Sequence, residues 1–398
     1  MQNNKSTVFS IMAIFFVAMG VGTITPAIAN IAAAFPEIPF TTVLLVSTLP
    51  SLLLIPSTLI AGSVAGTKIR YRTLALLGLA LFSIGGIGPA FLNSTFTTVL
   101  IFRGIFGISL GIIMPLGNAI ILGLYEGQAR ANLIGIGGFV MNIGGIVLQF
   151  LGGFFSDISW EFTFYAHFPA IISFFLVLFF LKEPKVPEAE IRERNVAKEK
   201  PPMSIWLISF IFGITMLLIY PMLVNMSSIM ADVKEIGDAS QAAITLAMYT
   251  VGGALAGAIF GSVYKYVPKR FIIPLALFGG AAGLAIIIYS NSFFTITLGV
   301  FIVGLFYMTS LPAVAMMIGM YSPPSANAMS MSILMAVMNA FAFVSTYWIG
   351  FITDMTGDPF IMPLVFAAVG FAIIGVLALF VNPFKEDPAP VQVPTESE

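Results

Sequence analysis

Twelve long apolar runs follow one another along this chain, and they constrain its fold more than any other feature. A helix that crosses a bilayer needs about 20 mainly apolar residues. The runs cover 7–34, 40–65, 73–93, 96–124, 130–155, 162–181, 204–231, 240–263, 270–290, 294–320, 327–353 and 359–382. The 398 residues are 59% hydrophobic and 9% charged, against roughly 25% charged in a soluble domain. The sequence therefore predicts an all-α integral membrane protein with twelve transmembrane helices.

The basic residues lie almost entirely on one side of these predicted spans. If the N-terminus is cytoplasmic, so are the loops after spans two and eight and the charged stretch 182–203. All but two of the 17 Lys and Arg residues then face the cytoplasm; the exceptions are Lys234 and, within span four, Arg103. Because an excess of Lys and Arg marks cytoplasmic loops, we expect a multi-pass protein of the cell inner (cytoplasmic) membrane with both termini in the cytoplasm.

The two halves of the chain repeat each other at an offset close to half its length. The matched segments are Val140–Asn142 with Val337–Asn339, Gly153 and Asp157 with Gly350 and Asp354, Asn93–Ser94 with Asn291–Ser292, Pro26 and Asn30 with Pro221 and Asn225, and Gly62–Val64 with Gly261–Val263. Six spans per half give both halves the same orientation, and in transporters such a parallel repeat places the binding site between the halves. We predict two six-helix bundles, 1–181 and 204–384, a cytoplasmic linker 182–203 and a disordered tail 385–398.

This plan resembles the major facilitator superfamily of secondary transporters over nearly the whole chain. The loop from Gly62 to Arg72 is similar to the family pattern G-x-L-A-D-R-x-G-R-R, although Gly66 holds the position of the acid, as does Lys265 in the second copy. The resemblance implies a cytoplasmic gate that is held differently here. The gating-loop residues that it implies are Gly62, Lys68, Arg70, Gly261 and Lys269.

Two other stretches are similar to signatures of the same family. The span-four signature, an arginine followed by a glycine-rich face, is carried by Arg103, Gly104, Gly107 and Gly111. The span-five antiporter signature is half present: Gly144, Gly152 and Gly153 fit, whereas Leu148 and Gln149 hold its Gly-Pro positions. That departure weakens the case for a drug antiporter and leaves the expected fold unchanged.

Polar side chains inside the spans are the candidate substrate-binding residues. A charge such as that of Arg103 costs about 2.5–3.5 kcal/mol at the centre of a membrane helix, so it should face a wet cavity or a partner. It would anchor an anionic or carbonyl-bearing solute or modulate a proton site; the structural alternative is a hydrogen bond between spans. The other candidates are Asn30, Asn118, Asn142, Gln149, Asn225, Tyr307 and Asn339, and interhelical hydrogen bonding is the alternative for each.

The chemistry absent from the sequence narrows the function. There are no cysteines and a single histidine, His167, which is a candidate proton carrier. No Asp or Glu lies in the middle of a span, and the chain has no phosphate-binding G-x-x-x-x-G-K-[ST] loop. We therefore expect no metal site, no cofactor, no nucleic-acid partner and no enzymatic activity.

The sequence predicts a secondary active transporter that moves a small organic solute, neutral or anionic, across the bilayer by alternating access. Protons are the candidate coupling ion, and a monomer is expected. Two alternatives stay open. One is a multidrug or amphiphile efflux antiporter, and the other is a non-transporting receptor or scaffold on the same fold.

Overall fold

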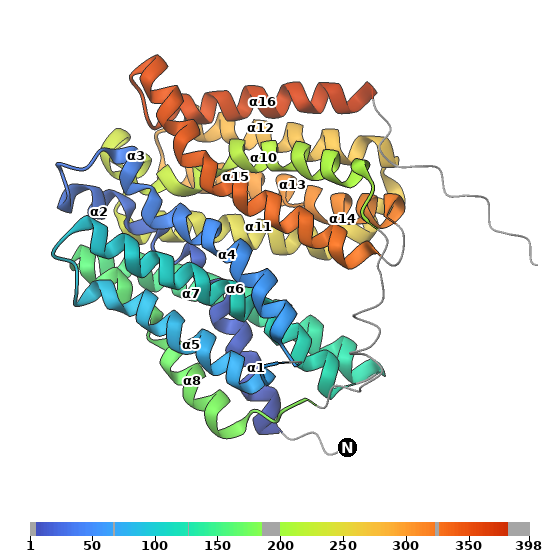
Figure 1. Cartoon of the computed structure of the whole chain (residues 1–398). Coiled ribbons are helices and arrows are strands. Elements are labelled where there is room, and N and C mark those ends of the chain that lie inside the picture. Colours follow the sequence, from blue (N-terminus) through green and yellow to red (C-terminus); the bar gives the residue numbers. More distant parts are fainter. Residues whose placement is uncertain (1–4, 67, 126, 185–199, 323–325, 381–398) are drawn as a thin grey trace, which may run out of the picture.

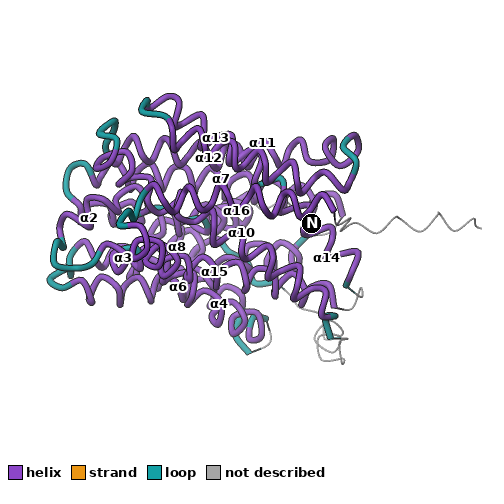
Figure 2. The backbone as a smooth tube through the Cα atoms, turned by 90° about the horizontal axis from the view of Figure 1, so that it is seen from above, coloured by secondary structure: helices purple, strands orange, loops and turns teal. Residues whose placement is uncertain are grey.

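A computed structural model describes residues 5–66, 68–125, 127–184, 200–322 and 326–380. The predicted tail 385–398 and all but the ends of the predicted linker 182–203 lie outside the described residues. Within those ranges the chain is mainly helical and no strand occurs. The helix axes are roughly aligned with one another (Figure 2).

Long helices account for almost all of the described chain, with short 3-10 or π-helical turns between some of them. The α-helices are α1 (Lys5–Ala18), α2 (Ile28–Ala34), α3 (Phe40–Val43), α4 (Leu45–Val64), α5 (Tyr71–Ile87), α6 (Phe96–Leu124), α7 (Gly127–Ser156), α8 (Pro169–Phe180), α10 (Met203–Ser228), α11 (Ala239–Tyr266), α12 (Ile272–Tyr289), α13 (Phe293–Tyr307), α14 (Ser310–Tyr321), α15 (Asn327–Thr356) and α16 (Ile361–Phe380). The 3-10 turns are η1 (Gly20–Gly22), η2 (Thr25–Ala27), η3 (Gly88–Ala90), η4 (Trp160–His167) and η6 (Lys269–Phe271), and η5 (Ile229–Val233) is a π-turn.

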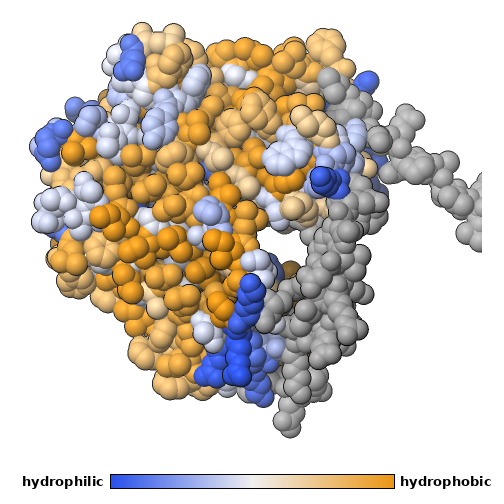
Figure 3. All heavy atoms as spheres, in the orientation of Figure 1, coloured by the Kyte–Doolittle hydropathy of each residue, from blue (hydrophilic) through white to orange (hydrophobic). Residues whose placement is uncertain are grey.

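Twelve continuous or nearly continuous helical segments of the described chain are long and apolar enough to cross a membrane. They run from Lys5–Ala34 to Ile361–Phe380, and each coincides with one of the predicted spans to within a few residues. The predicted all-α fold of twelve spans is therefore confirmed. Figure 3 shows the apolar belt that results, with hydrophilic residues gathered mainly at its two ends.

The spans form two six-helix bundles, α1–α8 and α10–α16 (Figure 1). Each bundle has its own apolar core, one of them around Phe82, Phe106 and Leu110 and the other around Phe212, Tyr307 and Phe371. The internal packing repeats as well: α4 and α5 flank α6 in the first half, as α11 and α12 flank α13 in the second. The repeat in the sequence is thus a repeat of structure.

Two spans are interrupted, each near residues that weaken a helix. The first span changes from α1 into the short turns η1 and η2 between Gly20 and Ala27 and then continues as α2. Glycine lowers helix propensity, and a proline such as Pro26 is accommodated only at the start of a new helical segment. The tenth span breaks between α13 and α14, next to Pro312, which has no N–H to donate to the carbonyl of Met308.

The two halves meet at one end of the bundle and separate at the other. At the closed end, Thr48 and Thr346 share a hydrogen bond of 2.7 Å, and the Ala29 N–H donates to Ser227 Oγ at 3.2 Å. The apolar side chains that seal this end are Ile28, Leu44, Val224 and Ile349, with Phe40 and Tyr220 against them. The halves diverge toward the end where the N-terminus lies (Figure 1), and the surface is hollowed between them there (Figure 3).

The glycines of the separated end are open. A Cβ added at Gly62 of α4, or at Gly257 or Gly261 of α11, would meet nothing within 4 Å. Small residues allow helices to approach closely, but these three glycines make no close contact with another helix in this conformation.

Candidate functional site

A cavity of about 150 Å³ lies between the halves, just inside the closed end. Its walls come from the interrupted first span, α4 and α7 on one side and from α10 and α11 on the other. The lining residues are Met19, Val21, Gly22, Thr25, Ser47, Gly145, Gln149, Tyr220, Leu223, Val224, Leu246, Tyr249 and Thr250. The predicted position of the site, between the two repeats, coincides with this cavity.

The polar groups in the cavity are uncharged. Gln149 comes from the first half, and Tyr220 and Tyr249 come from the second. The hydroxyl of Tyr249 is buried and has no hydrogen-bond partner among the described residues. A buried polar group left unpaired costs about 1–3 kcal/mol, so this hydroxyl favours a bound solute or water that pairs with it. The arrangement can bind a molecule through hydrogen bonds and apolar contact and offers it no countercharge.

The broken first span gives the cavity part of its polarity. Thr25 and Gly22 lie in the short turns of that span. Irregular backbone at membrane depth is tolerated where it is buried in protein or lines a cavity. Two glycines of α7 make room for it, because a Cβ at Gly144 or Gly152 would lie 1.9 Å from the carbonyl oxygen of Phe16 or Thr23.

Asp157, directly after α7, joins the first half to the second at the closed end. Its carboxylate accepts hydrogen bonds from the Ala239 and Ser240 N–H groups at 3.0 Å each, and from the Ser240 hydroxyl. These N–H groups begin α11, where the helix dipole favours a negative charge. Asp238 caps the same helix from within, accepting from the Gln241 N–H at 2.8 Å.

Arg103 lies outside the cavity, fully buried inside the first half. Its Nε donates to the carbonyl of Val46 at 2.8 Å, and its guanidinium lies 4.2 Å from the ring centre of Phe106. The Val46 carbonyl would ordinarily accept the N–H four residues on, but that residue is Pro50. Arg103 thus pairs a carbonyl that Pro50 leaves free, next to cavity residue Ser47.

His167 is buried nearby and is likewise not part of the cavity lining. Its Nδ1 lies 3.0 Å from the carbonyl oxygen of Phe164, and its ring packs on Phe82 and Phe106. Its Nε2, like the two terminal nitrogens of Arg103, has no partner within the described part of the chain.

The mated asparagines make mated contacts that hold helices in place. Asn30 Nδ2 donates to the backbone oxygen and hydroxyl of Ser156, at 3.0 and 2.9 Å, and Asn225 Nδ2 donates to the Pro359 carbonyl at 2.8 Å. Asn30 therefore ties the first span of its half to the last residue of α7, and Asn225 ties the first span of its half to the loop that follows α15. This is the interhelical alternative, and it is what the structure shows for this pair.

The second mated pair bonds within its own helix. Asn142 and Asn339 donate to the carbonyls four residues earlier, Gly138 and Met335, at 2.9 Å each. Of the other candidates, Asn118 is exposed on α6, and Tyr307 is buried in the second core, with its hydroxyl 3.1 Å from Thr215 Oγ1. Among the candidates proposed from sequence, the structure brings only Gln149 into the cavity wall.

The gating loop of the first half turns back within its own bundle. Gly66 stands where the family pattern has an acid and adopts a positive φ of 71°, a conformation that favours glycine. The N–H groups that open α5, those of Tyr71 and Arg72, donate to the carboxylate of Glu183 at 2.7 and 3.0 Å. Lys68 and Arg70 are exposed in this loop. The acid that caps this end of the bundle thus comes from the stretch after span six.

In the second half, Lys269 lies 5.1 Å from the ring centre of Tyr264, and Gly261 is open. Of the described residues, no group of three or more His, Asp or Glu side chains is placed to hold a metal ion.

Most cavity residues escaped prediction from sequence. Tyr220, Tyr249, Ser47, Thr25 and Thr250 are common residue types in spans, and none of them repeats at a mated position. The sequence feature that could have indicated a cavity residue was the position of Tyr220 beside Pro221, next to the predicted interface between the halves.

The comparisons agree with this architecture. The chain belongs to the Major Facilitator Superfamily, whose sequence profile matches residues 10–232 and 205–397. The predicted family is confirmed.

Curated relatives are matched over part of their length. The chain is 29% identical over 166 residues to the multidrug transporter protein MdtP of Bacillus subtilis, covering 40% of this chain and 29% of that protein. It is 33% identical over 150 residues to the multidrug efflux pump SdrM of Staphylococcus aureus, covering 37% and 31%. The quinolone resistance protein NorA of Staphylococcus aureus is 21% identical over 262 residues, 64% of this chain and 66% of NorA. The chain thus matches less than a third of the first two relatives.

Solved structures share the fold over nearly the whole chain. A bacterial homologue of the human lysosomal transporter Spinster, in an inward-facing and occupied conformation, has a TM-score of 0.74 at 17% identity, covering 96% of this chain and 97% of that one. The human organic anion transporter MFSD10 has a TM-score of 0.63 at 14% identity, covering 95% and 100%. At these identities the likeness shows the fold alone.

Proposed function

We propose that this chain moves a neutral, partly apolar organic solute across the cytoplasmic membrane by alternating access, with the cavity between the halves as its binding site. The observation that carries this proposal is a cavity between the halves whose polar lining residues are uncharged, and whose lining residue Tyr249 has a buried hydroxyl without a hydrogen-bond partner among the described residues. Arg103, the residue that favoured an anion, serves the Val46 carbonyl instead, so the neutral class is preferred.

With the basic loops in the cytoplasm, as we infer, the conformation is that of an inward-facing transporter. The basic loops after spans two and eight lie at the separated end, and Lys and Arg mark cytoplasmic loops. The N- and C-termini are then cytoplasmic, and the cavity opens to the cytoplasm while the contacts around Asp157 close the outside. We further infer a monomer of two bundles, 1–181 and 204–384, with no enzymatic activity.

Export of lipophilic drugs is the second candidate function. It is supported by the relatives, whose names describe multidrug transport and quinolone resistance. The apolar members of the cavity wall, among them Met19, Leu223 and Leu246, suit such ligands.

Transport in proteoliposomes tests these candidates. Neutral solutes, organic anions and lipophilic cationic drugs are compared, each with and without a pH gradient. We expect saturable flux of a neutral solute; flux restricted to cationic drugs would favour the export candidate, and no flux in any class would favour the receptor or scaffold. A response to the pH gradient tests protons as the coupling ion.

Two variants test the site itself. Tyr249→Phe removes only the orphaned hydroxyl, and we expect it to raise the KM about ten-fold, because a hydrogen bond that is lost from a buried group costs about 1–2 kcal/mol. Tyr289→Phe is the matched control, since that side chain is 86% exposed at the end of α12. Equal behaviour of the two variants would remove Tyr249 from the site.

A further inference from the structure

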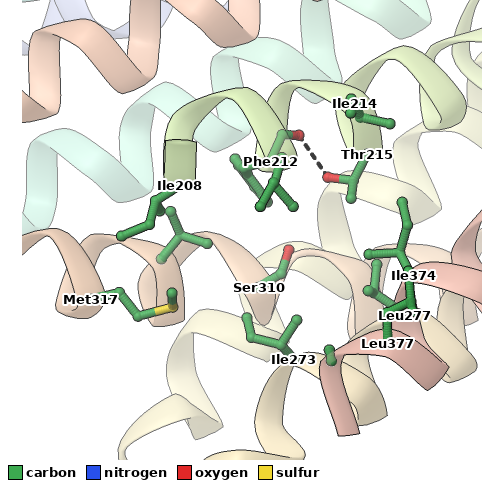
Figure 4. Close-up of a pocket in the computed structure, with 13 residues that line it drawn as sticks. Ile208, Phe212, Ile214, Thr215, Ile273, Leu277, Ser310, Met317, Ile374 and Leu377 are labelled. Carbon is green, nitrogen blue, oxygen red and sulfur yellow. Dashed lines mark hydrogen bonds between the residues drawn. The ribbon is translucent and has the colours of Figure 1, made fainter. Parts of the chain in front are cut away.

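A second cavity, larger than the one between the halves, lies within the second bundle. It has a volume of about 400 Å³, in the range of small-molecule sites. Its lining residues come from α10, α12, α14 and α16 (Figure 4) and are Ile208, Ile211, Phe212, Ile214, Thr215, Ile273, Leu277, Ser310, Val314, Met317, Ile374, Leu377 and Ala378. We call it the tail pocket.

The tail pocket can contact a ligand only through apolar groups. Its two hydroxyls are already engaged: Thr215 donates to the Phe212 carbonyl at 2.7 Å, and Ser310 donates to the Tyr307 carbonyl at 2.5 Å. Figure 4 shows apolar side chains converging around them. A ligand with polar groups in this space would leave them unpaired, which is costly, so the pocket fits an alkyl chain.

The pocket owes its shape to the break in the tenth span. At that break α14 begins with Ser310, and the pocket-lining residues Ser310, Val314 and Met317 follow at helical spacing on one face of α14. In the first half the mated proline, Pro115, lies inside the unbroken helix α6. The pocket is therefore built by a feature in which the two halves differ.

The mouth of the pocket faces lipid. Ile211 and Leu377 line it while 45% and 60% exposed, and the neighbouring Ile373 of α16 is 55% exposed. In a chain that spans the membrane, such apolar exposure is contact with lipid tails. From Ile208 to Thr215 the pocket extends about 10 Å along α10, which lies within one leaflet of about 15 Å.

Basic side chains stand where this leaflet meets the water. Ile273 is the second residue of α12, and it follows η6, which packs against α16 and carries the exposed Arg270. Lys200, just before α10, is exposed as well. A basic residue at a membrane surface attracts anionic lipids.

We propose that the tail pocket binds one acyl chain of an anionic phospholipid from the leaflet on the side of the basic loops, with its headgroup at Arg270. The acyl chain would lie between α14 and α16 and so support the interrupted tenth span. This site is separate from the transport cavity, and the proposal does not depend on the identity of the solute.

Photolabelling tests the proposal on the full chain in nanodiscs. Phosphatidylglycerol and phosphatidylcholine, each with a diazirine near the tail end, are crosslinked by light, and the labelled peptides are identified by mass spectrometry. We expect phosphatidylglycerol to label peptides of α10, α14 and α16 that line the pocket, in preference to phosphatidylcholine.

Two kinds of variant separate the tail contact from the headgroup contact. Ala378→Trp fills the pocket and should abolish this labelling, whereas Ile101→Trp, at a 59% exposed position of α6, should not change it. Arg270→Gln, a surface change that leaves the fold intact, should reduce the preference for phosphatidylglycerol about five-fold, since one basic residue at the surface contributes about 1 kcal/mol. Arg70→Gln, in the corresponding loop of the first half, is its matched control.

The proposal is overturned if both lipids label the pocket equally in wild type and Arg270→Gln. It is also overturned if Ala378→Trp abolishes solute transport while leaving lipid labelling unchanged, because the pocket would then hold substrate. Loss of the labelling in both Trp variants would show that it does not report on this pocket.

Discussion

Replacing Asp157 with alanine removes a contact between the halves at the closed end, and we expect this contact to exist only while that end is closed. The carboxylate pairs the first two N–H groups of α11, those of Ala239 and Ser240, from across the interface between the halves. Asp238 pairs the third, that of Gln241, from within the second half. Only the Asp157 contact must break when the halves separate at this end.

The size of the effect follows from helix capping. Replacing an N-cap acceptor with alanine costs about 0.5–2 kcal/mol. Asp157 is exposed, and Asp238 still caps the helix in the variant, so we take about 1 kcal/mol. That value raises the ratio of outward-facing to inward-facing molecules about five-fold.

Pairs of spin labels measure this ratio directly. The chain has no cysteine, so two introduced cysteines are the only labelled sites. Leu122→Cys and Met329→Cys place one label in each half at the separated end, and Phe91→Cys and Tyr289→Cys do so at the closed end; all four positions are at least 49% exposed. In Asp157→Ala, the short-distance population of the first pair and the long-distance population of the second should both rise about five-fold.

Two carboxylates serve as controls. Asp238→Ala weakens α11 in either conformation, so it should lower thermal stability without moving the ratio. Asp354, the repeat mate of Asp157, is exposed at the end of α15 and makes no hydrogen bond to the first half among the described residues, so Asp354→Ala should change neither. Distance distributions that do not respond to Asp157→Ala, or that respond equally to Asp354→Ala, would refute the reasoning.

Two further changes test the interface and the buried arginine. Gly153→Ala places a Cβ 2.5 Å from the Ala239 carbonyl oxygen and should force the outer end open, raising the long-distance population of the outer label pair; Gly350→Ala, whose nearest contact is 3.6 Å, should not. Arg103→Met leaves the Val46 carbonyl unpaired and should cost about 1–3 kcal/mol in thermal unfolding. In a Pro50→Ala background the new N–H can pair that carbonyl, so the cost should fall by about 1 kcal/mol in a double-mutant cycle; costs that simply add would rule out the pairing.

The fold could be predicted because it depends on the length and the mean hydropathy of each span, to which every residue of the span contributes. Length and hydropathy mark each helix independently, and the sidedness of the basic loops checks the count. The break in the tenth span could not be predicted, because Pro115 and Pro312 occupy mated positions in similar apolar runs and only the second interrupts its helix. Local sequence does not distinguish them, since the outcome depends on the neighbouring helices.

The candidate site was less predictable, for a reason that the asparagines illustrate. An amide in a span must hydrogen-bond somewhere, and Asn30, Asn225, Asn142 and Asn339 all find backbone carbonyls. The sequence shows that a polar side chain in a span needs a hydrogen-bond partner. It does not show whether another group of the protein already serves as that partner. Tyr249 lines the proposed site and its hydroxyl has no partner among the described residues, and both are properties of the packed structure.

In each half a glycine of the central helix packs against a neighbouring helix, but the residue that it contacts differs between the halves. The two walls of the cavity differ as a result. Gly107 of α6 packs on Pro50, with a Cβ there 2.6 Å from the Pro50 Cα, and Gly304 of α13 packs in the same way on Tyr249, at 2.3 Å from its carbonyl oxygen. The offset that mates Gly62 with Gly261 also mates Pro50 with Tyr249. Where the first half has Pro50 and Arg103 pairs the carbonyl that this proline leaves free, the second half has Tyr249, which lines the cavity. The buried charge therefore supports one wall of the cavity, and the unpaired hydroxyl belongs to a residue of the opposite wall, where we propose that the solute binds.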